Sequence, residues 1–161
     1  MTTRQSRSIR LSEANTVSTR ENHGRTHLRK SAIKRLADAR ALLRTGDEHT
    51  GGAMYLAGYA VECKLKAVAL EIFGCWTLEA LAEKWDVDER DVYTHGLEAL
   101  AKRLPLYGRL AASPVWRDFA GAVNQWKPSW RYSPKNPRRE KAESFLESVS
   151  KVCTWLDSNR C

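Results

Sequence analysis

The chain has 161 residues, of which 42% are hydrophobic, so its length and composition suit one compact domain. It has only nine glycines and five prolines, too few turn-forming residues for a many-stranded β fold. The formal net charge of +8 suits an anionic partner, whereas no apolar run is long enough to cross a membrane and no Cys/His spacing suits zinc. No metal and no cofactor is therefore expected.

Residues 1–30 hold seven basic and two acidic side chains and show neither a helical nor a strand period. We predict that they form a disordered basic arm, which either neutralises phosphates or only adds solubility. The predicted domain covers residues 31–157, and residues 158–161 are a short tail. Four cysteines without a CxxC pair, and no apolar leader, indicate a reducing, cytoplasmic setting.

Two amphipathic helices are predicted first. Ser31 can cap a helix that ends at Thr45 and Gly46, and its apolar stripe recurs at spacings of three and four residues. The second helix spans about residues 52–73 and stops at Gly74. This helix is apolar over much of its circumference, as a central buried helix is, and Gly58 within it can allow another helix to approach closely.

The rest of the chain also has a helical pattern. A short helix is predicted at 77–86, then a polar loop to Tyr93, then a helix from Thr94 that Pro105 kinks or ends. Ser113 and Pro114 open a further helix, and a loop follows at 127–135. Asn136 and Pro137 begin the last helix. The prediction is an all-α, up-and-down bundle of about five helices.

Three short motifs resemble the HEPN family of helical bundles. The segment from Tyr55 to Ala67, with Gly58, Glu62 and Leu-Lys-Ala, looks like the family's central helix, and Thr94-His95-Gly96-Leu97 resembles the opening of its next helix. Trp130-Arg131-Tyr132 resembles the Arg-Tyr signature before the last helix. The resemblance implies a dimerising bundle associated with nucleic acid or nucleotides in a toxin–antitoxin or defence system.

The central helix carries two charges that need partners. Glu62 and Lys66 are four residues apart, on the same helical face as Tyr59, and can pair with each other. Buried charges require compensation, and His95 and Arg131 are the natural candidates. We predict a polar cluster of these four residues, with Tyr59 and Tyr132 beside it. It either serves function or only fixes the register of the helices.

In the HEPN family, many members resemble metal-independent ribonucleases, in which four to six residues separate an Arg from a following His near the last helices. Here the spacing occurs three times, at Arg20/His27, Arg44/His49 and Arg90/His95, and no His follows His95. Such a site would use His95 as the base, with Arg131 or Arg90 stabilising the phosphorane charge. This activity is the first alternative function.

A basic, aromatic segment supports the leading hypothesis, a binding or regulatory module. Cations can hold phosphates and aromatic rings can stack on bases. The opposing interpretation is that the tryptophans are core and the charges are solvated. The predicted nucleic-acid-binding residues are Lys127, Trp130, Lys135, Arg138, Arg139 and Lys141.

A partner role is the remaining alternative. HEPN proteins often accompany small nucleotidyltransferases or antitoxins, and this sequence has no Gly-rich phosphate loop of its own. Any nucleotidyl transfer would therefore come from another chain. We expect a homodimer, as the resemblance implies.

Overall fold

The computed structural model describes residues 24–160, and most of that range is helical. The all-α class predicted from the sequence is confirmed, with about five major helices and no strand in this part of the chain. The elements are α2 (Arg25–Thr45), η1 (Asp47–His49), α3 (Thr50–Ile72), α4 (Leu78–Trp85), α5 (Glu89–Val92), α6 (Leu97–Lys102), α7 (Tyr107–Ala111), α8 (Trp116–Gly121), η2 (Val123–Gln125), η3 (Pro128–Tyr132) and α9 (Arg139–Ser158).

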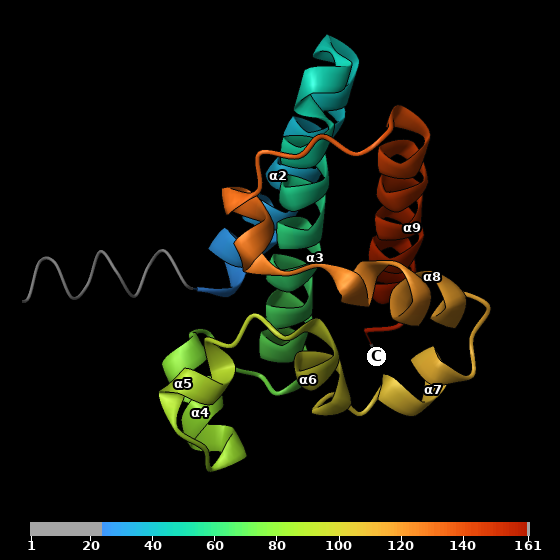
Figure 1. The fold of residues 1–161 in the computed structure, drawn as a ribbon. Helices are drawn as coiled ribbons and strands as arrows, with labels where there is room; N and C mark the ends of the chain where they lie inside the picture. The colour runs from blue at the N-terminus through green and yellow to red at the C-terminus, as the bar shows by residue number, and fades with distance from the viewer. Residues whose placement is uncertain (1–23, 161) are drawn as a thin grey trace, which may run out of the picture.

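Helix α3 forms the centre of the molecule. It packs against α2 and α9 along its length and also contacts η3 and α6. In Figure 1, α2 runs antiparallel to α3, whereas α9 runs parallel to it. Every residue from 60 to 70 is buried, charged residues included, because neighbours cover α3 on all sides. This is the central, buried helix that its apolar circumference predicts.

Helix α2 begins earlier than predicted. Its first residue is Arg25, not Ser31, so the predicted 1–30 arm is too long by at least six residues. Leu28 is buried and extends the apolar stripe of Ala32 and Ala39 by one turn toward the N-terminus. The backbone N–H of Arg25 also donates to the Trp76 carbonyl at 2.9 Å, which fixes this end of the helix. Residues 1–23 of the predicted arm lie outside the described residues.

The chain between α3 and α9 forms more and shorter helices than its apolar spacing predicts. Gly74 ends the α3 region with a positive φ of 65°, as expected of a glycine stop. The predicted loop after α4 contains the short helix α5, and the helix predicted from Thr94 starts at Leu97. The stretch 113–126 divides into α8 and η2, because Trp126 leaves the helix to pack on α3.

The last helix, α9, starts at Arg139 and ends at Ser158, one residue past the predicted domain end. Arg160 still pairs with Glu71 of α3 at 3.1 Å, so part of the predicted 158–161 tail belongs to the packed structure. No helix of residues 24–160 is both long enough and apolar enough to cross a membrane.

Candidate functional site

The carboxylate of Glu62 lies at the centre of a buried polar cluster on α3. Only 3% of Glu62 is exposed, and its two oxygens have different partners. Lys66 Nζ donates to Oε1 at 2.7 Å, and His95 Nδ1 lies 2.9 Å from Oε2. The helix supplies Glu62 and Lys66 one turn apart, and the segment before α6 brings His95 to them. Three members of the predicted cluster therefore meet.

His95 faces solvent on its other side. Its side chain is 57% exposed, and no residue in the described part of the chain bonds its Nε2. A carboxylate accepts hydrogen bonds, so this contact favours a proton on Nδ1, and in the neutral ring that tautomer leaves the lone pair on Nε2. A carboxylate that orients imidazole in this way produces a general base. The arrangement can take a proton from a group that approaches Nε2.

Arg131 does not join this cluster, so that part of the prediction is wrong. It comes from η3, its guanidinium lies 4.8 Å from the Tyr132 ring centroid, and interactions with Tyr132 and then Tyr55 raise its pKa. Tyr55 precedes Glu62 by seven residues, which is about 10 Å along an α-helix. The loop before α9 lies beside the start of α3, whereas His95 lies beside its middle.

Tyr59 lies between the two positions. Its ring stacks in parallel on that of Tyr55, with centroids 6.4 Å apart, and its hydroxyl interacts with Cys63. Burial first, and then the charges of Cys63 and Glu62, raise the pKa of Tyr59 to about 12. Tyr59 therefore stays protonated and neutral at physiological pH. Tyr132, by contrast, is 76% exposed.

Arg90 of α5 pairs with Asp88, the residue that caps the same short helix. Its Nε lies 3.0 Å from Asp88 Oδ1, and this contact raises the pKa of Arg90 and lowers that of Asp88. Both side chains are largely exposed, and no interaction connects Arg90 with His95. The Arg90/His95 spacing in the sequence does not correspond to a pair in the structure.

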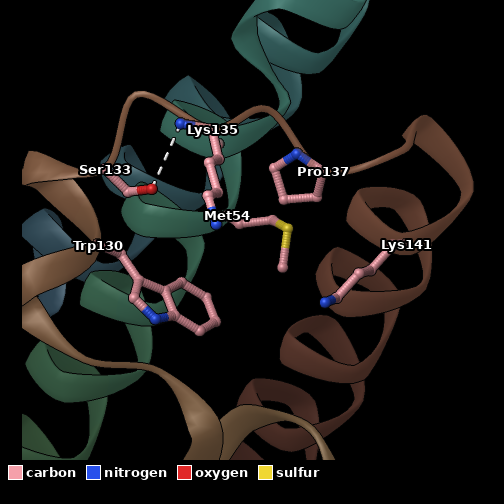
Figure 2. Close-up of a pocket in the computed structure, with 7 residues that line it drawn as sticks. Met54, Trp130, Ser133, Lys135, Pro137 and Lys141 are labelled. Carbon is pink, nitrogen blue, oxygen red and sulfur yellow. Dashed lines mark hydrogen bonds between the residues drawn. The ribbon is translucent and has the colours of Figure 1, made fainter.

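The basic segment before α9 encloses a pocket of about 230 Å³, drawn in Figure 2. Met54 of α3 forms its floor and Trp130 of η3 borders it, while Lys135 and Lys141 reach it from different sides. Neither lysine ammonium has a hydrogen-bond or ion-pair partner among residues 24–160. The pocket thus combines an apolar interior with two uncompensated cations.

The other predicted binding residues divide into two groups. Lys127 and Arg138 are exposed and have no side-chain partner in the part of the chain that is described. Arg139 instead holds the fold together: its Nε lies 2.6 Å from Asp47 Oδ1, and its guanidinium donates to the Leu43 carbonyl at 2.9 Å. Arg139 therefore connects α9 to the end of α2 and is not available for a ligand.

Among the residues that line the pocket, sequence reasoning missed Ser133 and Pro137 of the basic segment and two residues of a distant helix, Gly51 and Met54. The latter two lie about eighty residues before Lys135, and no local pattern connects them with it. The contact depends on Asn136, whose side-chain oxygen accepts from the Gly51 N–H at 3.4 Å, and on Thr50, whose hydroxyl donates to the Pro137 carbonyl at 2.7 Å. Asn136 thus binds the start of α3 and does not begin α9.

Comparison with known proteins assigns neither a family nor a function to this chain. No family model, no curated protein and no solved structure matches this chain. Among residues 24–160, no group of three or more His, Cys, Asp or Glu side chains could hold a metal ion.

Proposed function

We propose that this chain is a nucleic-acid- or nucleotide-binding module that uses the pocket before α9. The observation that carries the proposal is the pair of unpartnered ammonium groups, Lys135 and Lys141, beside the half-buried indole of Trp130. Exposed Arg138 and Lys127 add positive charge along the same segment. Cations without neighbouring carboxylates attract phosphates, and a nearby aromatic ring suits a base.

The fold and motifs support a wider proposal of family and setting. The Tyr55–Ala67 segment lies in the central helix α3, His95 precedes α6, and Arg131 precedes α9, in the chain order of the motifs that resemble HEPN. We propose an HEPN-like bundle of about five major helices. A cytoplasmic homodimer in a toxin–antitoxin or defence system, with a nucleotidyltransferase or antitoxin as a possible second chain, follows from that resemblance.

Salt-dependent RNA binding tests the binding module. Each phosphate contact to a single strand contributes about 0.7 to the slope of log affinity against log salt. Replacing Lys135 and Lys141 by Gln should weaken binding and lower this slope by about 1.4. Lys84→Gln is the matched control, because Lys84 is an exposed, unpaired lysine on α4, at the far end of α3. Equal affinities for wild type and double variant would refute the proposal.

A second candidate function, metal-independent RNA cleavage, is supported by the His95–Glu62 contact of 2.9 Å. In this function, His95 Nε2 takes the proton of a ribose 2′-hydroxyl while Glu62 holds the ring. The 2′-oxygen then bonds to the adjoining phosphorus, the bond from phosphorus to the 5′-oxygen breaks, and the leaving oxygen takes a proton from the protonated His95 or from water. Arg131 lies beside Tyr55, about two helical turns from Glu62 along α3. It is therefore less well placed than His95 to contact the same phosphate.

The cleavage test uses purified protein with mixed cellular RNA and no added metal. His95→Ala should abolish cleavage, whereas Arg90→Ala should retain it, because Arg90 is paired with Asp88 and not with His95. Cleavage that persists in the His95 variant would exclude this site. Absence of cleavage by wild type would leave the chain as a binding module.

A further inference from the structure

The pocket in Figure 2 is apolar inside and cationic at its opening. Met54 is only 3% exposed and closes the floor. Trp130 packs on Phe145 of α9, with ring centroids 5.6 Å apart and an interplanar angle of 53°. This contact fixes the indole in place and leaves the part of it that borders the pocket available. Lys135 and Lys141 approach the same space from the loop and from α9.

The size of the pocket limits what it encloses. Its volume of about 230 Å³ lies below the roughly 300–1,000 Å³ of sites that bury a whole drug-sized ligand. It therefore accommodates one fragment of a ligand, while the remainder stays outside against the rim. An apolar interior with cations at the rim suits a flat, weakly polar fragment that has anionic groups attached to it.

We infer that the pocket takes a single unpaired nucleobase beside Trp130, with the adjoining phosphates on Lys135 and Lys141. This inference rests on the proposed binding function and specifies its ligand as a single strand or a free nucleotide. A base in a duplex is paired and stacked, so it must be extruded before it enters such a pocket, whereas an unpaired base enters without that cost. Tyr132 is exposed two residues after Trp130 and offers a second ring to a neighbouring base.

Anisotropy measurements on three labelled RNAs test the inference: a single strand, a blunt duplex of the same length and a hairpin with an open loop. Wild type should prefer the single strand and the hairpin loop over the duplex. Trp130→Leu keeps an apolar side chain against Phe145 but removes the aromatic ring, and should weaken single-strand binding by about five-fold to a hundred-fold. Trp130→Phe restores a ring and should recover most of the affinity.

Trp76→Leu is the matched control, because Trp76 is an exposed tryptophan beyond the C-terminal end of α3, far from the pocket. Thermal unfolding of each variant shows whether Trp130→Leu remains folded. If it does not, the wild-type comparison of single strand and duplex keeps the test decisive, because it needs no variant and equal affinities would overturn the base pocket. Competition by AMP and UMP then identifies the source of the base: strong competition indicates a free nucleotide, and weak competition indicates a strand.

The outcomes separate this inference from the function on which it rests. Lysine-dependent binding with equal affinity for single strand and duplex, unaffected by Trp130→Leu, would overturn the base pocket and leave a phosphate-binding surface. Binding that is insensitive to both the lysine and the tryptophan variants would overturn the inference and the proposed function together. A single-strand preference that only the Trp130→Leu change removes supports the pocket.

Discussion

At the residue scale, Gly58 is the glycine of α3 at which an added Cβ would meet its neighbours most closely. The sequence predicts a close approach there, and the structure shows that the approaching group is the indole of Trp126, not a helix. A Cβ at Gly58 would overlap Cγ and Cδ1 of that ring. The indole cannot easily withdraw, because it is buried and its Nε1 donates to the Tyr55 carbonyl at 3.0 Å.

Gly58→Ala should therefore destabilise the protein even though alanine favours helices by about 1 kcal/mol. Overpacking of this kind typically costs about 1–3 kcal/mol, and displacement of the indole also breaks its hydrogen bond. Urea unfolding measures the change. Gly121→Ala in α8, where a Cβ meets nothing within 4 Å, is the control and should be neutral or slightly stabilising. A stabilised Gly58→Ala protein would show that Trp126 does not occupy this position.

Two buried thiols should make the fold sensitive to alkali. Burial raises the pKa of Cys153 from 9.0 to about 11, and burial followed by the Glu62 charge raises that of Cys63 to about 11. In the unfolded chain each thiol loses its proton near pH 8.5–9. Between pH 9 and 11 the unfolded state thus binds fewer protons than the folded state, so the free energy of unfolding falls as pH rises.

The contribution of Cys153 can be isolated with two neighbouring variants. Raising the pKa of Cys153 from 9.0 to about 11 corresponds to about 2–3 kcal/mol of stability, present below pH 9 and lost by pH 11. Cys153→Ala should remove this part of the pH dependence. Val152→Ala truncates the adjacent buried side chain and should lower stability at every pH without flattening the slope. Urea unfolding at pH 7, 9 and 10.5 compares them, and identical slopes in all three proteins would contradict the shift.

At the element scale, the sequence predicts the long helices well and the short ones poorly. Helix α3 has apolar residues around most of its circumference and a glycine stop, so its place at the centre follows from its own pattern. The segment 113–126 has an equally regular apolar spacing. Its last turn is the 3-10 helix η2, not α-helix, and the chain turns extended at Trp126, whose indole packs on Gly58.

The same distinction explains which site residues could be predicted. Glu62 and Lys66 share a helical face, and two buried charges require a partner such as His95, so their cluster follows from local geometry and electrostatics. The position of Arg131 depends on the path of the loop before α9. The pocket depends on Asn136 reaching the start of α3, a contact between distant segments that no periodic pattern encodes.

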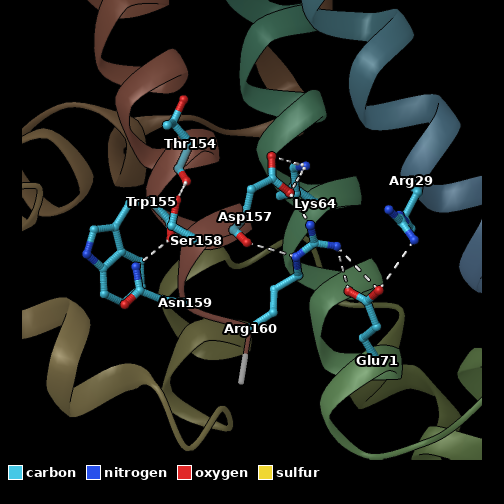
Figure 3. A network of polar contacts seen from close by, with 9 residues as sticks. All are labelled: Arg29, Lys64, Glu71, Thr154, Trp155, Asp157, Ser158, Asn159 and Arg160. Atoms are coloured by element: carbon cyan, nitrogen blue, oxygen red, sulfur yellow. Dashed lines mark hydrogen bonds and ion pairs between the residues drawn. The ribbon is translucent and has the colours of Figure 1, made fainter.

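The contact between α3 and α9 includes the Lys64–Asp157 ion pair, drawn in Figure 3, whose two side chains are unequally exposed. Lys64 Nζ lies 2.8 and 2.9 Å from the two Asp157 oxygens, and the Lys64 side chain is 11% exposed whereas that of Asp157 is 44% exposed. Arg160 also approaches Asp157, at 3.4 Å, and pairs with Glu71, which Arg29 of α2 reaches as well. Three helices therefore meet at one network.

Because of this asymmetry, the two halves of the Lys64–Asp157 pair should respond differently to mutation. Lys64→Met removes a mostly buried charge and leaves Asp157 solvated and near Arg160, so it should change stability by less than about 1 kcal/mol. Asp157→Asn leaves the Lys64 ammonium without its anion and should cost more, about 1–3 kcal/mol. Thermal unfolding compares them, with Lys151→Met of an exposed pair as the control. A larger loss in Lys64→Met would contradict the buried position of that lysine.

At the scale of the whole molecule, stability is unevenly distributed. Helix α3 is covered by α2, α9, α6 and η3, so its middle cannot be exposed unless these neighbours separate. Helices α4 and α5 lie at the far end of α3 and project away from the three long helices, as Figure 1 shows. They pack mainly on each other, with a small set of buried residues: Leu78, Leu81, Ala82 and Val92.

Hydrogen exchange should therefore resolve two levels of opening. Amides of residues 60–70 should exchange only when the whole domain unfolds, with a free energy equal to that from urea unfolding. Amides of residues 79–92 should exchange through a local opening that lies a few kcal/mol lower, because α4 and α5 can detach while α2, α3 and α9 stay together. Gly58→Ala should lower protection of residues 60–70 by its full cost and change that of residues 79–92 less. Equal protection of both segments would show that the α4–α5 unit unfolds only together with the bundle.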